Sequence, residues 1–175
     1  VDDETIKHRK FIPGETFAEI LRWVPVTTVD FVPTRVVDGV RQFMLGLRKE
    51  APFQDTWFVA GGRKNYGERT RSALKRQVLR ELGLDIDAHG VTAVLRGVVD
   101  VLNPECLDAD AGARPQWHSN WLFHEIELAD GVEPVAMAEN KEVKWFTHIL
   151  PEFPEPVQEG LMLLGFEFAE ESPPA

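Results

Sequence analysis

The alternation of apolar and polar residues along the chain predicts several β-strands. The segments 26–32 and 41–48 are rich in β-branched and aromatic residues, and the Asp38-Gly39 pair between them is typical of a hairpin turn. Further segments of this kind are 56–62, 91–102 (with a bend near Gly97), 117–128 and 143–150. We therefore expect a sheet built from these strands.

Other segments have the spacing of an amphipathic helix. They are the run that opens at Gly14 and ends before Pro25, the run 68–82, and a terminal run at 157–168. Gly83 follows the second run at the place where a left-handed residue ends many helices. This order of helices and strands predicts an α+β fold in which a mixed sheet is sandwiched between α-helices.

The length and composition favour one domain with a hydrophobic core. The chain has 175 residues and is 43% hydrophobic. We expect a flexible lead at 1–14, a single domain at 15–170 and a frayed tail at 171–175. The single cysteine, Cys106, excludes an internal disulfide and fits a reducing compartment. Because no uncharged apolar run approaches the ~20 residues that cross a bilayer, we expect a cytoplasmic protein without a membrane partner.

The net charge of −10 limits the possible partners. An acidic chain repels nucleic-acid backbones, which argues against a nucleic-acid partner. A phosphate-bearing substrate would then need a local region of positive charge, made from clustered arginines, a bound cation, or both. Arg48, Arg63 and Arg76 are close enough in sequence to supply the arginines.

Residues 61–84, GGRKNYGERTRSALKRQVLRELGL, carry a motif of fixed spacing. The motif G-x5-E-x7-R-E-U-x-E-E-x-G-U, where U is a bulky aliphatic residue, is matched at Gly62, Glu68, Arg76, Val78, Glu81, Gly83 and Leu84. Gln77 and Arg80 stand where the motif has two further glutamates. The segment resembles the Nudix box of magnesium-dependent hydrolases that act on a nucleoside diphosphate linked to another group. The resemblance implies a Nudix fold and a hydrolase.

Divalent-metal chemistry suits such a substrate, because Mg²⁺ (or Mn²⁺) neutralises a diphosphate through oxygen ligands. The box implies Glu81 as a carboxylate ligand and Gly61 as a carbonyl donor. Gln77 lies one turn before Glu81 on the same face but cannot accept a proton, and Arg80 opposes additional metal ions. We therefore expect fewer metal ions than a full box would hold. The alternative to a metal-binding helix is a surface helix with many ion pairs. For Arg80 itself, an exposed ion pair with a nearby acid is as good an interpretation as a place at the site.

The altered box and the preceding WFVAGGR are similar to the GDP-mannose mannosyl hydrolases, which lack the same two glutamates. The likeness covers residues 15–150. It implies a homodimer that hydrolyses a nucleotide sugar at the anomeric carbon, giving GDP and inverted mannose with one Mg²⁺. It also implies that Arg48, Arg63 and Arg76 bind the phosphates or the sugar, and we place Arg48 among the catalytic residues. Asp30 would contact the sugar or a catalytic arginine.

The chain departs from that family just before the segment 143–150. The family has a Gln-His pair there, with the histidine as general base, whereas this chain has Glu139 and Asn140. Glu139 could hold the metal ion, but Asn140 cannot take a proton. Glu139, Glu142 or His118 is then the candidate base. A general base contributes about 10²–10⁴-fold, so a slower reaction could survive its loss.

These residues leave three functions open. The first is magnesium-dependent release of GDP and sugar from a nucleotide sugar such as GDP-mannose. The second is hydrolysis at phosphorus within the same fold, which would give a nucleoside monophosphate and a sugar phosphate. The third is a nucleotide-sugar-binding protein that has lost catalysis.

Overall fold

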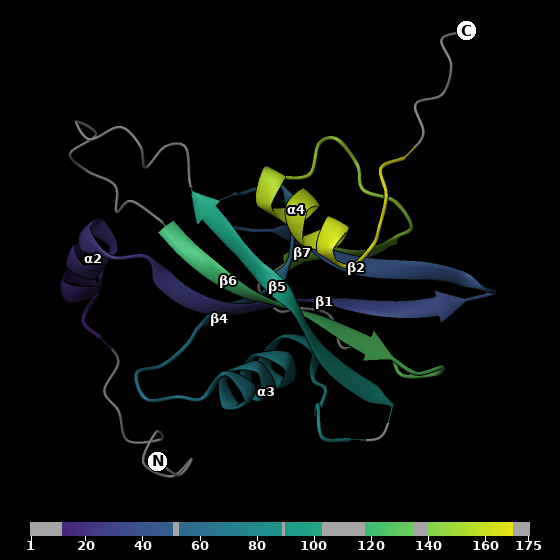
Figure 1. Ribbon diagram of the computed structural model, residues 1–175, viewed down its shortest axis with the longest axis horizontal. Helices are drawn as coiled ribbons and strands as arrows, with labels where there is room; N and C mark the ends of the chain where they lie inside the picture. The colour runs from purple at the N-terminus through teal and green to yellow at the C-terminus, as the bar shows by residue number, and fades with distance from the viewer. Residues whose placement is uncertain (1–11, 51–52, 89, 103–117, 135–139, 170–175) are drawn as a thin grey trace, which may run out of the picture.

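The computed structural model gives the arrangement of helices and strands shown in Figure 1. The described residues are 12–50, 53–88, 90–102, 118–134 and 140–169. Their helices are α2 (Gly14–Trp23), α3 (Thr70–Leu82) and α4 (Glu155–Leu163). Their strands are β1 (Val26–Val37), β2 (Val40–Arg48), β3 (Trp57–Phe58), β4 (Ala60–Arg63), β5 (Val91–Leu102), β6 (His118–Leu128) and β7 (Asn140–Phe146). Among these helices, none combines the length and the apolar character that a membrane span requires.

The described strands form one mixed sheet. Its main path runs β3-β2-β1-β6-β5, while β4 pairs with β1 and β7 pairs with β2. β1 and β6 are parallel, with Asp30 opposite Phe123 near the middle of the pair. The other pairs are antiparallel. The mixed sheet predicted from the sequence is confirmed.

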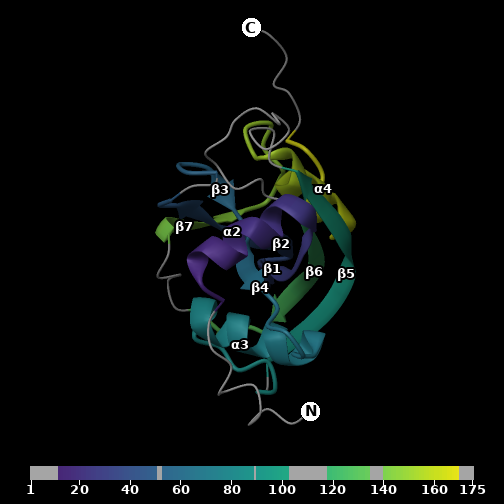
Figure 2. The same cartoon turned by 90° about the vertical axis from the view of Figure 1, so that its left-hand side faces the viewer.

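The sheet lies between two helices, with α4 on one face and α3 on the other (Figures 1 and 2). The cluster beneath α4 includes Val32, Phe43, Phe123, Val157 and Leu161. The cluster beneath α3 includes Phe31, Met44, Leu74, Val78 and Ile126. Adjacent residues of β1 and of β2 belong to opposite clusters because side chains alternate along a strand. The predicted sandwich of a sheet between helices is therefore confirmed.

The predicted hairpin is confirmed, whereas one predicted strand is divided. Asp38 and Gly39 have φ values of 51° and 78°, which suits the tight turn between β1 and β2. The segment 56–62, expected as one strand, forms β3 and β4 instead. The chain crosses between neighbouring strands at Val59, because β3 pairs with β2 and β4 pairs with β1.

α3 buries one face, and that face carries two polar residues. The helix ends at Gly83 as expected, with φ 67° and a 3.0 Å hydrogen bond from its N–H to the Leu79 carbonyl. Gln77 and Glu81 are buried together with the apolar residues of the same face. Buried polar groups need hydrogen-bond partners. We therefore expect the candidate site at the groups that surround Gln77 and Glu81.

Two predicted boundaries differ from the structure. β7 starts and ends earlier than the predicted segment 143–150, and Ile149 beyond it bridges to Phe168. α4 starts and ends earlier than the predicted run 157–168. Pro156 is tolerated in its first turn, and Gly165 follows the helix with φ 80°. The loop expected at 103–116 lies outside the described residues.

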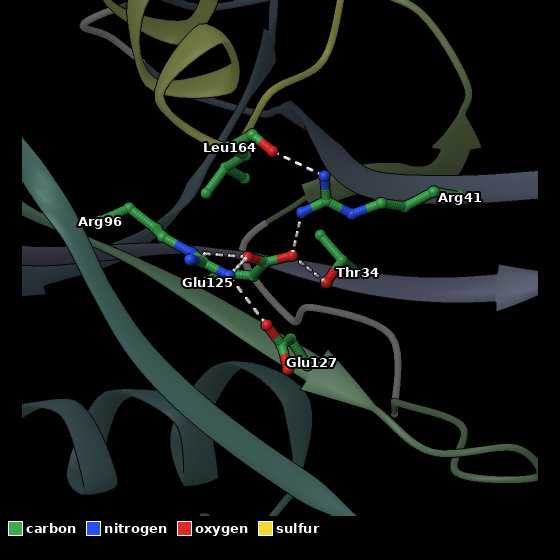
Figure 3. Close-up of polar contacts among 6 residues, drawn as sticks. All are labelled: Thr34, Arg41, Arg96, Glu125, Glu127 and Leu164. Atoms are coloured by element: carbon green, nitrogen blue, oxygen red, sulfur yellow. Dashed lines mark hydrogen bonds and ion pairs between the residues drawn. The ribbon is translucent and has the colours of Figure 1, made fainter.

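A buried carboxylate links α4 to the sheet (Figure 3). Glu125 of β6 accepts hydrogen bonds from Thr34 Oγ1 at 2.6 Å, Arg41 Nη2 at 2.5 Å and Arg96 Nε at 2.8 Å. Arg41 Nη1 also donates to the Leu164 carbonyl at the end of α4, at 2.6 Å. Burial raises the pKa of Glu125, but the hydrogen bonds from Thr34, Arg41 and Arg96 outweigh it and keep that pKa below its usual value.

Candidate active site

Gly61 and Gly62 lie in strand β4, between β1 and the buried face of α3. β4 carries both glycines, and Gly61 pairs with Asp30 across the ladder with β1. A Cβ at Gly61 would collide with the Asp30 carboxyl, and a Cβ at Gly62 would collide with the Gln77 amide. Gly61 therefore permits the close approach of the β1 backbone, whereas at Gly62 only the end of the Gln77 side chain would have to move to admit a Cβ.

A bidentate ion pair braces the loop between β4 and α3. Arg76 Nε donates to Glu68 Oε1 at 2.9 Å, and Arg76 Nη2 donates to Glu68 Oε2 at 2.8 Å and to the Arg63 carbonyl at 3.0 Å. Glu68 also accepts the Asn65 backbone N–H at 2.8 Å. Burial raises the pKa of Glu68, but these partners outweigh it and lower that pKa below its usual value. Arg76 thus holds the loop in place, and a direct contact with phosphate stays a prediction.

The two predicted metal ligands lie on either side of the Arg80 guanidinium. Glu81 is 5% exposed, and its Oε1 accepts hydrogen bonds from Arg80 Nε at 2.8 Å and from Arg80 Nη2. The same Nη2 lies 3.5 Å from the Gly61 carbonyl oxygen. One turn earlier, Gln77 Oε1 is buried and has no hydrogen-bond partner among the described residues. Three oxygen acceptors therefore belong to this corner of the fold.

These three oxygen atoms are suitable ligands for a single hard cation. The carbonyl of Gly61, the carboxylate of Glu81 and the buried amide oxygen of Gln77 are oxygen ligands of the kind that Mg²⁺ takes, with substrate phosphates completing the shell. Within the described ranges, His, Cys, Asp and Glu side chains form no group of three that could hold a metal ion. Glu139, the other predicted ligand, lies outside them. The arrangement therefore suits one ion rather than several.

Asp30, which pairs with Gly61, and Arg48, whose charge acts on Asp30, are candidates for a second part of the site. Asp30 is 7% exposed, and its Oδ2 accepts a hydrogen bond from Thr28 Oγ1. Burial raises the pKa of Asp30 from 3.8 to about 7, against the opposing effects of Thr28 and the Arg48 charge. The Arg48 guanidinium stands 5.1 Å from the centre of the Phe58 ring. The charge of Arg48 and the carboxyl of Asp30 can therefore act together.

Asn140, which stands where the resemblance predicts the general base, lies next to Arg48. The two residues pair across β2 and β7, at an irregularity in the ladder. A Cβ at Gly46 would collide with the Asn140 side chain, so Gly46 makes room for it. His118 starts β6 and pairs with Leu102 of β5. It is three strands away from Asn140, about 14 Å at the usual strand spacing, so the structure does not bring the two together.

Arg63 connects the site to α2. Its guanidinium lies 3.8 Å from the centre of the Phe17 ring of that helix, a cation–π contact. Burial lowers the pKa of Arg63. The side chain is half-buried and its backbone belongs to the Gly-Gly strand, which places it at the edge of the candidate site.

Sequence reasoning overlooked what Glu68 and Gln77 do. Glu68 sits at a fixed spacing from Arg76 in the box, and that spacing was the available signal for their ion pair. The sequence predicts for Gln77 only that it cannot accept a proton, whereas the structure buries its amide next to Gly62 and leaves Oε1 without a partner among the described residues. No pattern in the sequence separates these outcomes, because both depend on how β4 packs against α3.

Comparisons with known proteins agree with this architecture. A MutT NUDIX hydrolase of Burkholderia pseudomallei is 22% identical, with a TM-score of 0.57 over 81% of this chain and 98% of that one. A Nudix hydrolase of M. smegmatis, RenU, is 16% identical, with a TM-score of 0.56 over 82% of this chain and 86% of that one. The chain has the Nudix fold. A third similar Nudix structure, the NUDIX domain of Shewanella oneidensis NrtR in complex with ADP ribose, is 16% identical, with a TM-score of 0.51 over 84% of this chain and 83% of that one.

Sequence comparison gives a shorter match. The low-salt glycan biosynthesis protein Agl8 of Haloferax volcanii is 32% identical over 98 residues, which are 56% of this chain. The match spans 60% of the length of Agl8. In the structural comparison, this chain likewise covers only 56% of a MutT/nudix family protein of Enterococcus faecalis. No protein-family model matches the chain. The Nudix fold therefore rests on structural similarity together with the box geometry.

Proposed function

We propose that this protein is a Nudix hydrolase that uses one divalent cation to release a sugar from a nucleoside diphosphate sugar, with GDP-mannose as the first candidate. The observation that carries the proposal is the position of the Gly61 carbonyl and the Glu81 carboxylate around Arg80, beside an amide rather than a carboxylate at Gln77. The box keeps an ion for the diphosphate but has no carboxylate at 77 to activate water against phosphorus. The name of Agl8, a glycan biosynthesis protein, supports a sugar-linked substrate.

The other site residues would either supply charge at the diphosphate or position the reacting groups. Gly61, Glu81 and Glu139 would hold Mg²⁺ or Mn²⁺, which neutralises the departing diphosphate. Arg48 and Arg63 would add positive charge at the phosphates. Asp30 lies close enough to Arg48 for their charges to interact, so it would orient that arginine or bind a sugar hydroxyl.

A carboxylate is the better candidate for the proton acceptor than Asn140 or His118. Asn140 has no basic atom and would position the attacking water through its amide. Glu142 is exposed on β7, opposite Leu47, and Glu139 precedes that strand. Either carboxylate could take the proton as the bond to the anomeric carbon forms and the diphosphate departs.

Product analysis tests the reaction. Nucleotide sugars are incubated with Mg²⁺ in ¹⁸O-labelled water, and the products are separated by mass spectrometry. A nucleoside diphosphate and a labelled sugar support the proposal. A monophosphate and a sugar phosphate with label on phosphorus would show the second reaction. Nucleotide-sugar binding without product would leave the third function, a binding protein.

Two variants test the cation assignment. Glu81→Gln and Glu139→Gln are each expected to lower the rate by about 10²-fold or more, because the diphosphate loses its counter-charge. Glu159→Gln on the exposed side of α4 is the matched control and should leave the rate unchanged. Unchanged rates in both site variants would contradict the assignment.

The homodimer is part of the proposal as well. Trp23, at the end of α2, is 76% exposed, and α2 lies at one end of the sheet (Figure 1). Light scattering coupled to size exclusion measures the mass directly. A monomer at micromolar concentration would contradict a stable dimer.

A further inference from the structure

The Arg80 guanidinium takes the place between the two oxygens expected to hold a divalent cation. Nε and Nη2 of Arg80 both donate to Glu81 Oε1, and Nη2 also lies 3.5 Å from the Gly61 carbonyl. A divalent ion that binds Oε1 and this carbonyl directly would meet the guanidinium at the same position. The two cations therefore exclude each other from this corner.

Charge balance gives the pairing its physical reason. The Glu81 side chain is 5% exposed, and a buried carboxylate without a counter-charge is strongly destabilising. The motif with glutamates at 77, 80 and 81 would gather three negative charges and so require cations. In this chain Gln77 is neutral and Arg80 cancels Glu81, so these three side chains carry no net charge.

The buried Gln77 amide gives an independent sign of a ligand. Its Oε1 is buried without a hydrogen-bond partner among the described residues, and such an acceptor is costly unless something donates to it. A hydrated divalent ion beside Glu81, one helical turn away, would supply water donors or coordinate the amide oxygen. The Arg80 side chain is 49% exposed, so it has room to leave.

We propose that Arg80 is a tethered counter-ion that governs access to the cation site. Without a diphosphate, the guanidinium neutralises Glu81 and a divalent ion binds weakly. A diphosphate attracts the guanidinium to its oxygens, and the vacated carboxylate then takes the divalent ion. Binding of the divalent ion and of the diphosphate are thereby coupled through one side chain. This inference rests on the proposed cation site at Gly61 and Glu81.

Titration with Mn²⁺ in the absence of nucleotide tests the first half. Free Mn²⁺ is followed by electron paramagnetic resonance in the wild type, Arg80→Gln and the matched control Arg71→Gln. Arg71 lies on the same helix, is 73% exposed and pairs with Asp87, so both variants change the net charge equally. Arg80→Gln should bind Mn²⁺ at least about tenfold more tightly than Arg71→Gln, within the usual range of coupling between sites. Equal affinities would overturn the proposal.

Binding of GDP in EDTA tests the second half. If the guanidinium moves onto the diphosphate, Arg80→Gln should bind GDP several-fold more weakly than the wild type without any divalent ion, and Arg71→Gln should match the wild type. Equal GDP affinities in all three proteins would overturn the movement of Arg80.

Two further variants keep the test decisive if Arg80→Gln folds poorly. Arg80→Lys retains the charge without the two-pronged contact and should bind Mn²⁺ with intermediate affinity. Arg80→Gln with Glu81→Gln removes both charges, so it should fold and lose the Mn²⁺ site. If wild type and Arg80→Gln both bind Mn²⁺ tightly and equally, Arg80 does not govern access but the cation site stands. If neither binds Mn²⁺, with or without GDP, the cation site itself is wrong.

Discussion

Glu125 and Glu81 are buried carboxylates at two different places in the fold, and both are paired with arginine. The Glu125 side chain is 1% exposed and has two arginines and a threonine as donors (Figure 3). Those arginines have further partners, since Arg96 also donates to Glu127 and Arg41 to the end of α4. Glu81 is paired with the neighbouring residue Arg80, whose side chain is half exposed. The first carboxylate is locked by the tertiary structure, whereas the second is paired with a side chain that can move.

The regions around Glu125 and Glu81 also differ in whether their buried polar atoms have hydrogen-bond partners. Both oxygens of Glu125 have donors, as expected for a buried network that stabilises a fold. Near Glu81 the buried amide oxygen of Gln77 lacks a partner among the described residues. A fully satisfied network is typical of a structural role, and the acceptor without a donor is where we propose that a ligand binds.

The largest expected effect on stability is that of replacing Glu125 by glutamine, compared with the same change at Glu81. Glu125→Gln should lower the free energy of unfolding by about 3–5 kcal/mol, because Arg41 and Arg96 lose a buried counter-charge. Glu81→Gln should change it by less than about 1 kcal/mol, because Arg80 can turn to water. Urea unfolding of both variants measures the difference. Equal losses of stability would remove the distinction drawn between the two carboxylates.

The pH dependence of stability should have opposite signs at Asp30 and Glu125. The pKa of Asp30 is raised from 3.8 to about 7, so the folded state binds the extra proton and stability falls as pH rises from about 4 to 7, by at most about 4 kcal/mol. The pKa of Glu125 is lowered, so its contribution is present above the ordinary glutamate pKa and is lost as pH falls below it.

Unfolding at a series of pH values checks both signs. Asp30→Asn should flatten the curve between pH 4 and 7, and it should be more stable than the wild type at pH 8. Glu125→Gln should instead flatten the acid side. A wild-type curve that rises from pH 4 to 7 with the same slope as Asp30→Asn would contradict the raised pKa of Asp30.

Two glycine substitutions should have effects of intermediate size. One should lower mainly the stability, and the other should lower mainly Mn²⁺ binding and activity. A Cβ at Gly160 of α4 would stand 2.6 Å from the Phe123 ring, so Gly160→Ala should cost about 1–3 kcal/mol through overpacking while the remaining folded protein keeps its activity. Gly62→Ala would push the Gln77 amide away and should reduce Mn²⁺ binding and activity. Gly14→Ala, which has open space, is the control. Lost Mn²⁺ binding in Gly160→Ala would show that the two regions are coupled.

The smallest effect is expected at an exposed ion pair. Arg71 and Asp87 lie 2.6 Å apart, with their side chains 73% and 44% exposed. Solvent screens such pairs, so Arg71→Gln should leave the free energy of unfolding, measured by urea unfolding, almost unchanged. A loss as large as that of Glu125→Gln would show that surface pairs contribute to the fold as strongly as buried ones.

Local patterns in the sequence predicted the elements well, and failed where strands change partners. The helix ending at Gly83 and the hairpin at Asp38-Gly39 depend on residues near one another in the chain, so both are confirmed. The split of 56–62 depends on β2 and β1 lying side by side, which no local pattern reports. In the same way, the distance of His118 from Asn140 follows from strand order.

The sequence by itself determined the spacing of the box, the alternation that builds the sheet and the presence of Gln77 and Arg80, rather than carboxylates, at those positions. Only the tertiary structure decided that Arg80 points at Glu81 and Gly61, that the Gln77 amide is buried without a donor, and that Glu125 links α4 to the sheet. The physical reason is that charge and hydrogen-bonding capacity belong to a residue wherever it stands, whereas burial and partnership arise only when distant strands and helices pack together.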